Sequence, residues 1–325
     1  MNWSVALMLW TLPGVVGAGG QSPPVQVDPR LRPYAPVGGV SGNLKSIGSD
    51  TMSNLMTLWA EGFQRFYPHV QIEIEGKGST TAPPALIAGT AHFGPMSRPM
   101  KQAEIDQFEA RFGYKPTALP TAIDMLAIYV HQDNPLPSLT MAQVDAIFSK
   151  TRRAGHRLDI RTWGDLGLTG DWANKPISLY GRNSASGTYG YFKEHVLLNG
   201  DFKDEVKEQP GSSSVIQGIA SDRYAIGYSG MGYRTADVRA VPLARSSRSA
   251  PVEPTPENAY TGAYPMARFL YVYANIRPKT PLDPLRREFI RYIFSKDGQE
   301  VVIRDGYYPI TSPIAERILK SLGID

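Results

Sequence analysis

One pattern recurs along this chain: a short apolar stretch leads into a cluster of glycine, serine and threonine, and a helical periodicity follows. In its first occurrence, the apolar stretch 44–47 is followed by the cluster 48–51. Apolar side chains then recur at intervals of three and four residues between Met52 and Phe66, which is typical of an amphipathic helix. Such alternation of strands and helices predicts an α/β fold with largely parallel sheets.

Three further occurrences support this fold class. They place strand 70–74 before cluster 76–81, strand 177–180 before cluster 181–188, and, more weakly, cluster 211–214 before another helical pattern. Helices are also predicted over 103–112 and over 141–148, the latter with Thr140 as its N-cap.

The chain is long enough for two domains. At 325 residues it matches about two domains of average size. Two long apolar strands, predicted over 123–130 and 268–274, are suited to cross between two lobes. We expect a first lobe from residues 43–124 plus 266–325 and a second lobe from residues 125–265, with a ligand cleft between them and the crossing strands as hinge.

The N-terminus has the features of an export signal. An apolar run over 5–16, interrupted by Pro13, precedes small residues at 16–18 and is too short to span a membrane. We predict a signal peptide over 1–20, and hence a periplasmic or secreted protein; the alternative is a buried N-terminal segment. Residues 21–42, rich in Pro and Gly, are expected to form an extended arm, so that the folded part begins near Asn43.

Charge and motifs exclude several classes of function. Lys and Arg (34) exceed Asp and Glu (30) by only four, which argues against a dedicated nucleic-acid binder but allows an anionic ligand. The absence of cysteine removes thiolate metal sites and cysteine nucleophiles. Five scattered histidines lack metal-ligand spacing, and G-x-S-x-G, Walker and G-x-G-x-x-G motifs are missing. The sequence favours a protein that is not an enzyme and needs no metal or cofactor.

The Gly/Ser/Thr clusters carry the functional argument. A helix N-terminus exposes unpaired N–H groups and the positive end of the helix dipole, so it attracts anions. Plain N-capping accounts for any single cluster. In the third cluster, however, Arg182 stands four residues before Ser186, Gly187 and Thr188. Together, a guanidinium and a Ser-Gly-Thr helix start would surround a tetrahedral oxyanion with donors.

In their order, these segments resemble the phosphate-binding proteins of bacterial phosphate ABC transporters, the PstS family. Residues 182–188 (RNSASGT) are similar to the family's R-x-D-G-S-G-T stretch, and 48–52 (GSDTM) to its first strand-to-helix turn. Three more segments match a G-S-S/G loop, an F-G-A-S-D-x-P-L stretch and an A-I-G-Y strand: 78–80 (GST), 93–100 (FGPMSRPM) and 225–228 (AIGY). The ordered matches extend over roughly residues 43–310.

The resemblance implies a two-lobed type II periplasmic binding protein that closes around one dehydrated phosphate. It also implies that a monomeric protein hands inorganic phosphate to the permease of an inner-membrane ABC transporter, without nucleic acid as a partner. Carried over by position, the phosphate contacts fall on Thr51, the Met52 backbone, Ser79, Ser97, Arg182, Ser186, Gly187 and Thr188.

Two positions depart from the family pattern. Ser97 and Ser184 occupy places where the family usually has aspartates, the first to accept a phosphate proton and the second to hold the arginine. Asp50, next to Thr51, is our candidate for the missing acceptor, since a helix N-terminus favours its ionised form; its alternative role is N-capping. Arsenate or sulfate therefore stays open as the ligand. From another class, the alternative is a secreted phosphatase or other hydrolase using the Ser-rich loops.

Overall fold

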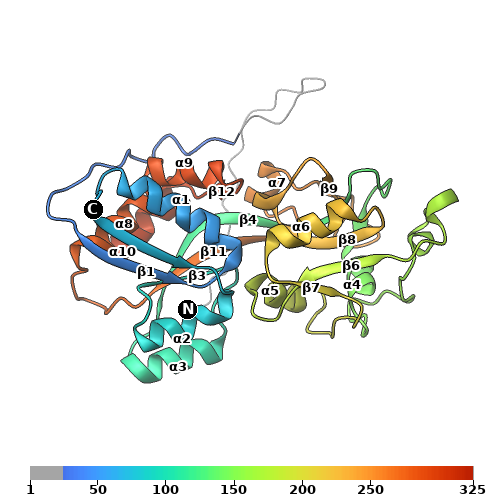
Figure 1. The fold of residues 1–325 in the computed structure, drawn as a ribbon, viewed down its shortest axis with the longest axis horizontal. Helices are drawn as coiled ribbons and strands as arrows, with labels where there is room; N and C mark the ends of the chain where they lie inside the picture. Colours follow the sequence, from blue (N-terminus) through green and yellow to red (C-terminus); the bar gives the residue numbers. More distant parts are fainter. Residues whose placement is uncertain (1–24, 325) are drawn as a thin grey trace.

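Two β-sheets share one long strand in this protein. The computed structural model describes residues 25–324, so the signal peptide predicted over 1–20 lies outside the described residues. In spatial order the strands are β2 (Val70–Glu75), β1 (Gly42–Ile47), β3 (Phe93–Met96), β11 (Ala267–Ala274), β4 (Thr117–His131), β8 (Ala225–Gly230), β6 (Ser178–Arg182) and β7 (Lys207–Gln209). Figure 1 shows two lobes side by side, with β4 and β11 between them.

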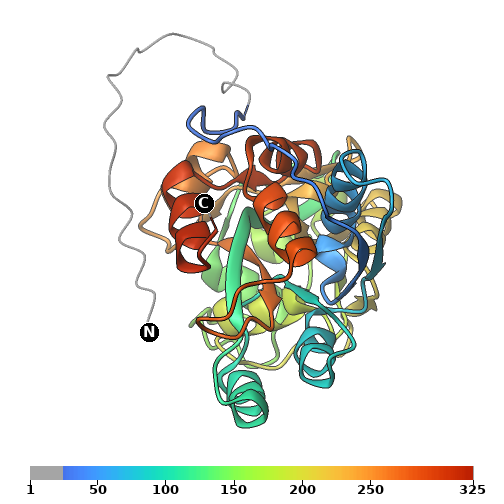
Figure 2. The same cartoon turned by 90° about the vertical axis from the view of Figure 1, so that its left-hand side faces the viewer.

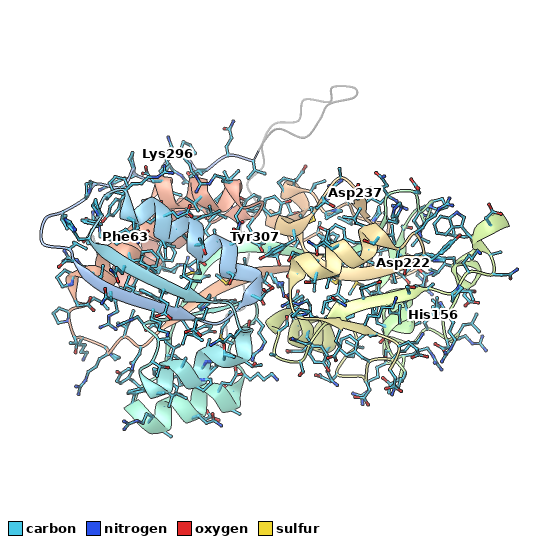
Figure 3. All side chains as sticks on the ribbon, viewed as in Figure 1. Phe63, His156, Asp222, Asp237, Lys296 and Tyr307 are labelled. Carbon is cyan, nitrogen blue, oxygen red and sulfur yellow. The ribbon has the colours of Figure 1, made fainter. Side chains whose placement is uncertain are left out.

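Lobe 1 is the half built on β1, β2 and β3. Its core is aromatic: Trp59 and Phe63 are fully buried, and the Phe63 and Phe289 rings lie 5.2 Å apart (Figure 3 labels Phe63). These residues bury because the three- and four-residue spacing places them on one helix face. The remaining elements of lobe 1 are α1 (Ser53–Gln64), α2 (Ala82–Ala88), α3 (Gln102–Phe112), α8 (Pro284–Ile293), α9 (Lys296–Arg304), β12 (Tyr308–Pro309) and α10 (Ser312–Ser321).

Lobe 2 is the half built on β6, β7 and β8. Phe192 and Tyr228 stack in its core, with ring centroids 3.9 Å apart and planes 8° from parallel. Its other elements are β5 (Leu139–Thr140), α4 (Met141–Phe148), η3 (Trp163–Leu166), η4 (Gly170–Trp172), α5 (Gly187–His195), α6 (Ser212–Ser221), η5 (Met231–Tyr233), β9 (Val238–Ala240), β10 (Leu243–Ala244) and α7 (Pro256–Tyr260). Within residues 25–324, no helix combines the length and apolarity needed to cross a bilayer.

The sheets are mixed, and the prediction of largely parallel sheets was wrong. Strand β1 pairs in parallel with β2 and β3, and β6 pairs in parallel with β7 and β8. By contrast, β4 runs antiparallel to β8 and β11, and β11 runs antiparallel to β3. Strands β4 and β11 pass between the two lobes (Figure 1), and the antiparallel pairs of β3, β11, β4 and β8 lie along this passage. The sequence bounds of the two lobes stay a prediction.

Lobe 1 begins earlier in the chain than expected. Residues 25–41 form no helix or strand, as predicted for an arm, but Leu31 and Tyr34 are buried in the lobe 1 core. The Tyr34 N–H donates to Asp297 on α9 at 2.7 Å, and the Lys296 N–H donates to the Arg32 carbonyl at 2.8 Å. In Figure 2 the arm (blue) passes over the C-terminal helices (red). The folded part therefore starts before Asn43.

Candidate functional site

The four Gly/Ser/Thr clusters converge where the lobes meet. Each follows the carboxyl end of a strand: β1 and β2 in lobe 1, and β6 and β7 in lobe 2. Because parallel strands end at the same edge of a sheet, each lobe brings its two clusters together, where α/β proteins commonly bind ligands. In lobe 1, two helical turns start there: η1 (Asp50–Met52), which leads into α1, and η2 (Ser79–Thr81), which leads into α2. In lobe 2, helices α5 and α6 start there.

Four hydroxyls from both lobes meet at this point, and we call them the hydroxyl cluster: Thr51, Ser79, Ser97 and Thr188. None of the four residues is more than 1% exposed. Thr51 Oγ1 lies 3.0 Å from Thr188 Oγ1, which joins lobe 1 to lobe 2. Ser97 Oγ lies 3.3 Å from Ser79 Oγ and 3.5 Å from Thr188 Oγ1. Buried polar groups need partners, and here hydroxyls serve one another as both donors and acceptors.

The start of α5 approaches lobe 1 closely. Ser186 caps this helix, its Oγ accepting the N–H groups of Thr188 at 3.1 Å and Tyr189 at 3.4 Å. Next to it, a Cβ placed on Gly187 would lie 2.2 Å from Ser79 Oγ. Only glycine therefore allows the positive end of α5 to reach the hydroxyl cluster.

Arg182, at the end of β6, is 1% exposed and lies 3.2 Å from Asp50, the residue before Thr51 of the cluster. Its Nη1 donates to Ser212 Oγ at 2.7 Å, and its Nη2 donates to the Pro210 carbonyl at 3.0 Å. Burial lowers the pKa of the Arg182 guanidinium, while the Asp50 carboxylate raises it. An arginine keeps its charge under such an effect, so a buried cation lies at the site.

Asp50 links the two lobes through this arginine. Its Oδ2 lies 3.2 Å from Arg182 Nη2 and accepts the N–H of Ser212, the first residue of α6, at 3.1 Å. Asp50 thus holds Arg182 in place, which was expected of residue 184 before a serine was found there. The role predicted for Asp50, accepting a phosphate proton, stays a prediction.

Met52 was predicted to contact the ligand through its backbone, so its side chain is free to pack elsewhere. Its side chain is buried in the lobe 1 core, and its N–H donates to the Ser49 carbonyl at 3.2 Å. The η1 turn is instead fixed by two tyrosines, since Tyr307 and Tyr233 donate to the Thr51 carbonyl at 2.8 and 3.1 Å. Tyr307 lies at the junction of the lobes in Figure 3. Burial raises the pKa of both tyrosines, so both hydroxyls remain donors.

Besides these tyrosines, Ser212, Arg268 and Asp124 lie at the site and were not predicted. Ser212 belongs to the weakest of the four clusters, and its spacing from Arg182 gave no sign of contact. Arg268 donates to Thr188 Oγ1 at 2.9 Å and pairs with Asp124. The sequence did contain a signal for this ion pair. Asp124 and Arg268 each stand near the start of a predicted crossing strand, and charged residues are rarely buried without a partner.

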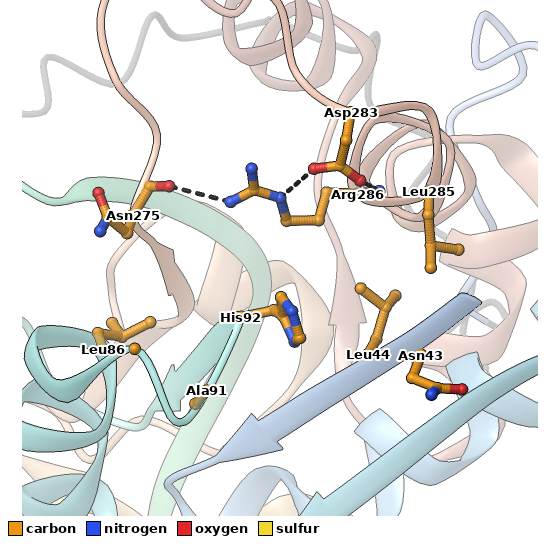
Figure 4. Close-up of a pocket in the computed structure, with 10 residues that line it drawn as sticks. Asn43, Leu44, Leu86, Ala91, His92, Asn275, Asp283, Leu285 and Arg286 are labelled. Carbon is orange, nitrogen blue, oxygen red and sulfur yellow. Dashed lines mark hydrogen bonds and ion pairs between the residues drawn. The ribbon is translucent and has the colours of Figure 1, made fainter. Parts of the chain in front are cut away.

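A separate cavity of about 310 Å³ lies on lobe 1, away from the hydroxyl cluster. Figure 4 shows that Arg286 at its edge is engaged with Asp283 and with the carbonyl of Asn275, 3.1 Å away. None of the predicted site residues lines this cavity. In the part of the chain that the structure describes, no group of three or more His, Asp or Glu side chains is placed to hold a metal ion.

Comparison with known proteins identifies the family. The model of the PBP superfamily domain matches residues 34–297. The phosphate-binding protein PstS of Pseudomonas aeruginosa is 56% identical over 308 residues, which is 95% of each chain. This chain belongs to the PstS family. SphX of Synechococcus elongatus is a more distant relative of this PstS-family chain, 26% identical over 78% of it and 73% of SphX.

Solved structures share the fold of this chain. A Clostridium perfringens protein, described as the substrate-binding protein of a phosphate ABC transporter and solved with bound phosphate, is 25% identical. It aligns with a TM-score of 0.70 over 83% of this chain and 100% of that one. An ABC-type phosphate transport receptor from Vibrio cholerae shares the fold, with a TM-score of 0.64, 21% identity, and coverage of 82% of this chain and 100% of that one.

Proposed function

We propose that this protein is a periplasmic binding protein without enzymatic activity that takes up inorganic phosphate between its lobes and delivers it to the permease of a phosphate ABC transporter. Its membership of the PstS family supports the proposal, as does the match to a Clostridium perfringens structure with bound phosphate. We further propose that it acts as a monomer and that Asp50, Thr51, Met52, Ser79, Ser97, Arg182, Ser186, Gly187 and Thr188 form its phosphate site.

The observation that carries this proposal is the buried hydroxyl cluster beside Arg182. Hydroxyl groups and helix N-termini from both lobes face one point, and a fully buried guanidinium lies next to it. An anion moved out of water needs several donors to replace its hydration, and these groups supply neutral and charge-assisted hydrogen bonds. Among the described residues no histidine bonds to the cluster, so the histidine–serine pairing of many hydrolases is not formed there.

Lobe closure is the mechanism we propose. Thr80 in lobe 1 donates from its N–H and its hydroxyl to the Ala185 carbonyl of lobe 2, at 3.2 and 3.1 Å. A ligand that bonds to both lobes stabilises the closed arrangement by its differential affinity for the closed and open states. The transporter would then recognise the closed form.

In this proposal, Asp50 makes the site selective for phosphate over sulfate. Near neutral pH phosphate carries at least one proton, so it can donate a hydrogen bond to a carboxylate. Sulfate carries no proton and cannot donate one. Asp50→Asn separates this role from the pairing with Arg182. If Asp50 accepts the proton, the variant gains sulfate affinity relative to phosphate; if Asp50 serves only to hold Arg182, affinity for both anions falls together.

The deciding experiment is a calorimetric titration of the purified mature protein with phosphate, followed by competition with arsenate and sulfate. We expect phosphate to bind at one site per chain and sulfate to compete weakly. Equal displacement of phosphate by sulfate would favour a general oxyanion binder. Turnover of a phosphomonoester by the purified protein would favour the hydrolase.

A further inference from the structure

Arg268 and Asp124 form an ion pair on the two strands that cross between the lobes. They are directly opposite each other in the antiparallel pairing of β11 with β4. Arg268 is 7% exposed and Asp124 is fully buried. Burying two charges costs desolvation free energy even when they are paired, so an ion pair at this position in the hinge needs an explanation.

The carboxylate of Asp124 fixes the position of the guanidinium. Its Oδ2 accepts Arg268 Nε at 3.0 Å and Nη2 at 2.8 Å, and its Oδ1 accepts the Met231 N–H at 3.2 Å. Met231 begins η5, directly after β8. The guanidinium carbon also lies 5.1 Å from the centroid of the Tyr191 ring. Asp124, itself bonded to η5, and the Tyr191 ring on α5 therefore hold the Arg268 guanidinium in a defined orientation.

This guanidinium is directed at the phosphate site. Nη2 also donates to Thr188 Oγ1 at 2.9 Å, and this oxygen lies 3.0 Å from Thr51 Oγ1. Among the described residues, the buried arginine nitrogens that have no partner are Arg182 Nε and Arg268 Nη1. Buried donors without acceptors are rare in folded proteins. Arg268 bonds to the hydroxyl cluster and Arg182 pairs with Asp50, the neighbour of Thr51, so each guanidinium has a donor left for a common anion.

We propose that Arg268 is a second cationic ligand of the bound oxyanion, supplied by the hinge strand β11 rather than by either pair of helix starts. This rests on the proposed function. With Arg268 as a ligand, the anion contacts lobe 1, lobe 2 and the strand that connects them. Binding then favours one conformation of the hinge directly, in addition to bridging the lobes.

The competing interpretation is an ion pair that only stabilises the fold. It predicts that loss of Arg268 lowers stability and leaves phosphate affinity unchanged. The test is a calorimetric phosphate titration of the wild type, Arg182→Ala and Arg268→Gln. Arg239→Gln is the control, because Arg239 on β9 is half-buried and donates to the Asn134 carbonyl, with no bond to the hydroxyl cluster.

We expect Arg268→Gln to lose affinity by about 10- to 100-fold, the range for a hydrogen bond to a charged group, and Arg239→Gln to stay within about twofold of the wild type. The double variant Asp124→Asn with Arg268→Gln keeps a neutral hydrogen-bonding pair at the hinge, so it tests the role of Arg268 even where the single variant folds poorly. It should show the same loss.

The outcomes separate this inference from the proposed function. If the wild type does not bind phosphate, the proposed function fails. If the wild type binds, Arg182→Ala loses affinity, and a folded Arg268→Gln or double variant binds like the wild type, then only the role of Arg268 is overturned. As a second readout, the rise in melting temperature caused by saturating phosphate should shrink in the Arg268 variants and persist in Arg239→Gln.

Discussion

Gly187 has no side chain, and this allows lobe 2 to contact lobe 1. A Cβ on Gly187 would lie 2.2 Å from Ser79 Oγ and 2.7 Å from Ser97 Oγ, both in lobe 1. We expect Gly187→Ala to lower phosphate affinity by about 10- to 100-fold, since over-packing costs about 1–3 kcal/mol. Gly190→Ala, in the same helix, is the milder comparison and should lower affinity less, because its Cβ would come no closer than 3.3 Å to another atom, Arg98 Cδ. Wild-type affinity of Gly187→Ala in calorimetry would contradict this account of the site.

Asp305 makes stability depend on pH. Burial raises the pKa of its carboxyl from 3.8 to about 6, while a hydrogen bond from Asn54 opposes this. The folded state therefore binds a proton more tightly than the unfolded state, and this contribution to stability is present below about pH 4 and lost as pH rises through about 6.

Asp305→Asn removes that titration and keeps an acceptor for Asn54. The variant should match the wild type near pH 4 and be more stable by roughly 2–3 kcal/mol at pH 7, the equivalent of a shift of about two pKa units. Urea unfolding of both proteins at several pH values measures the difference. A difference that does not change with pH would show that Asp305 is not responsible.

Single residues of the site could be predicted only where they occur in short motifs. Ser79, Gly187 and Thr188 belong to Gly/Ser/Thr clusters at helix starts, a local signal. Arg268 was missed because its contact with Thr188 spans 80 positions. The pairing of Asp50 with Arg182 was missed because it depends on how the lobes close.

At the scale of elements, local periodicity predicted helices better than sheet pairing. Helices α3 and α4 coincide with the predicted 103–112 and 141–148 to within one residue. Strand β4 extends over Thr117–His131, well beyond the predicted 123–130, because its ends pair with strands distant in sequence. Strand direction is likewise a property of the assembled sheet, which explains the wrong prediction of parallel pairing.

The N-terminal arm is a structural part of lobe 1. The Tyr34 hydroxyl donates to Glu288 at 2.9 Å, and its ring packs edge-on to Tyr292 at 5.5 Å. We expect Tyr34→Ala to lower the free energy of unfolding by about 3 kcal/mol, as is typical of removing a buried aromatic ring. Phosphate affinity should not change, since these contacts all lie within lobe 1 and outside the hydroxyl cluster.

Val37→Ala is the matched control in the same arm. Val37 is 37% exposed, so its truncation should change stability by about 0.5 kcal/mol or less. Urea unfolding of the two variants distinguishes a packed arm from a loose linker. Equal, small effects of both substitutions would mean that the arm does not support lobe 1.

At the scale of the whole molecule, the two ends of the chain build one core. Leu44 and Ile318 belong to the same buried cluster in lobe 1, while Phe148 and Tyr228 belong to the cluster of lobe 2. The chain length and the two long apolar strands predicted two lobes, but their closed arrangement depends on contacts such as Thr51 with Thr188 that no local pattern encodes.

Closure can be tested with a cross-link between the lobes. Thr80 and Ala185 lie on opposite sides of the junction, and the Thr80 N–H donates to the Ala185 carbonyl at 3.2 Å, so their backbones are adjacent. The chain contains no cysteine, so Thr80→Cys with Ala185→Cys introduces the sole thiol pair. Oxidised in the presence of phosphate, this variant should form a disulfide that holds the lobes closed.

If phosphate is enclosed between the lobes, its release requires opening, and the disulfide should slow release by at least about tenfold until a reductant is added. Release of radiolabelled phosphate during rapid filtration measures this rate before and after reduction. Each single-cysteine variant, oxidised in the same way, should release phosphate as the wild type does, which controls for the substitutions themselves. A cross-linked protein that exchanges phosphate at the wild-type rate would place the ligand outside the junction, because a site enclosed by both lobes cannot empty while they are tied together.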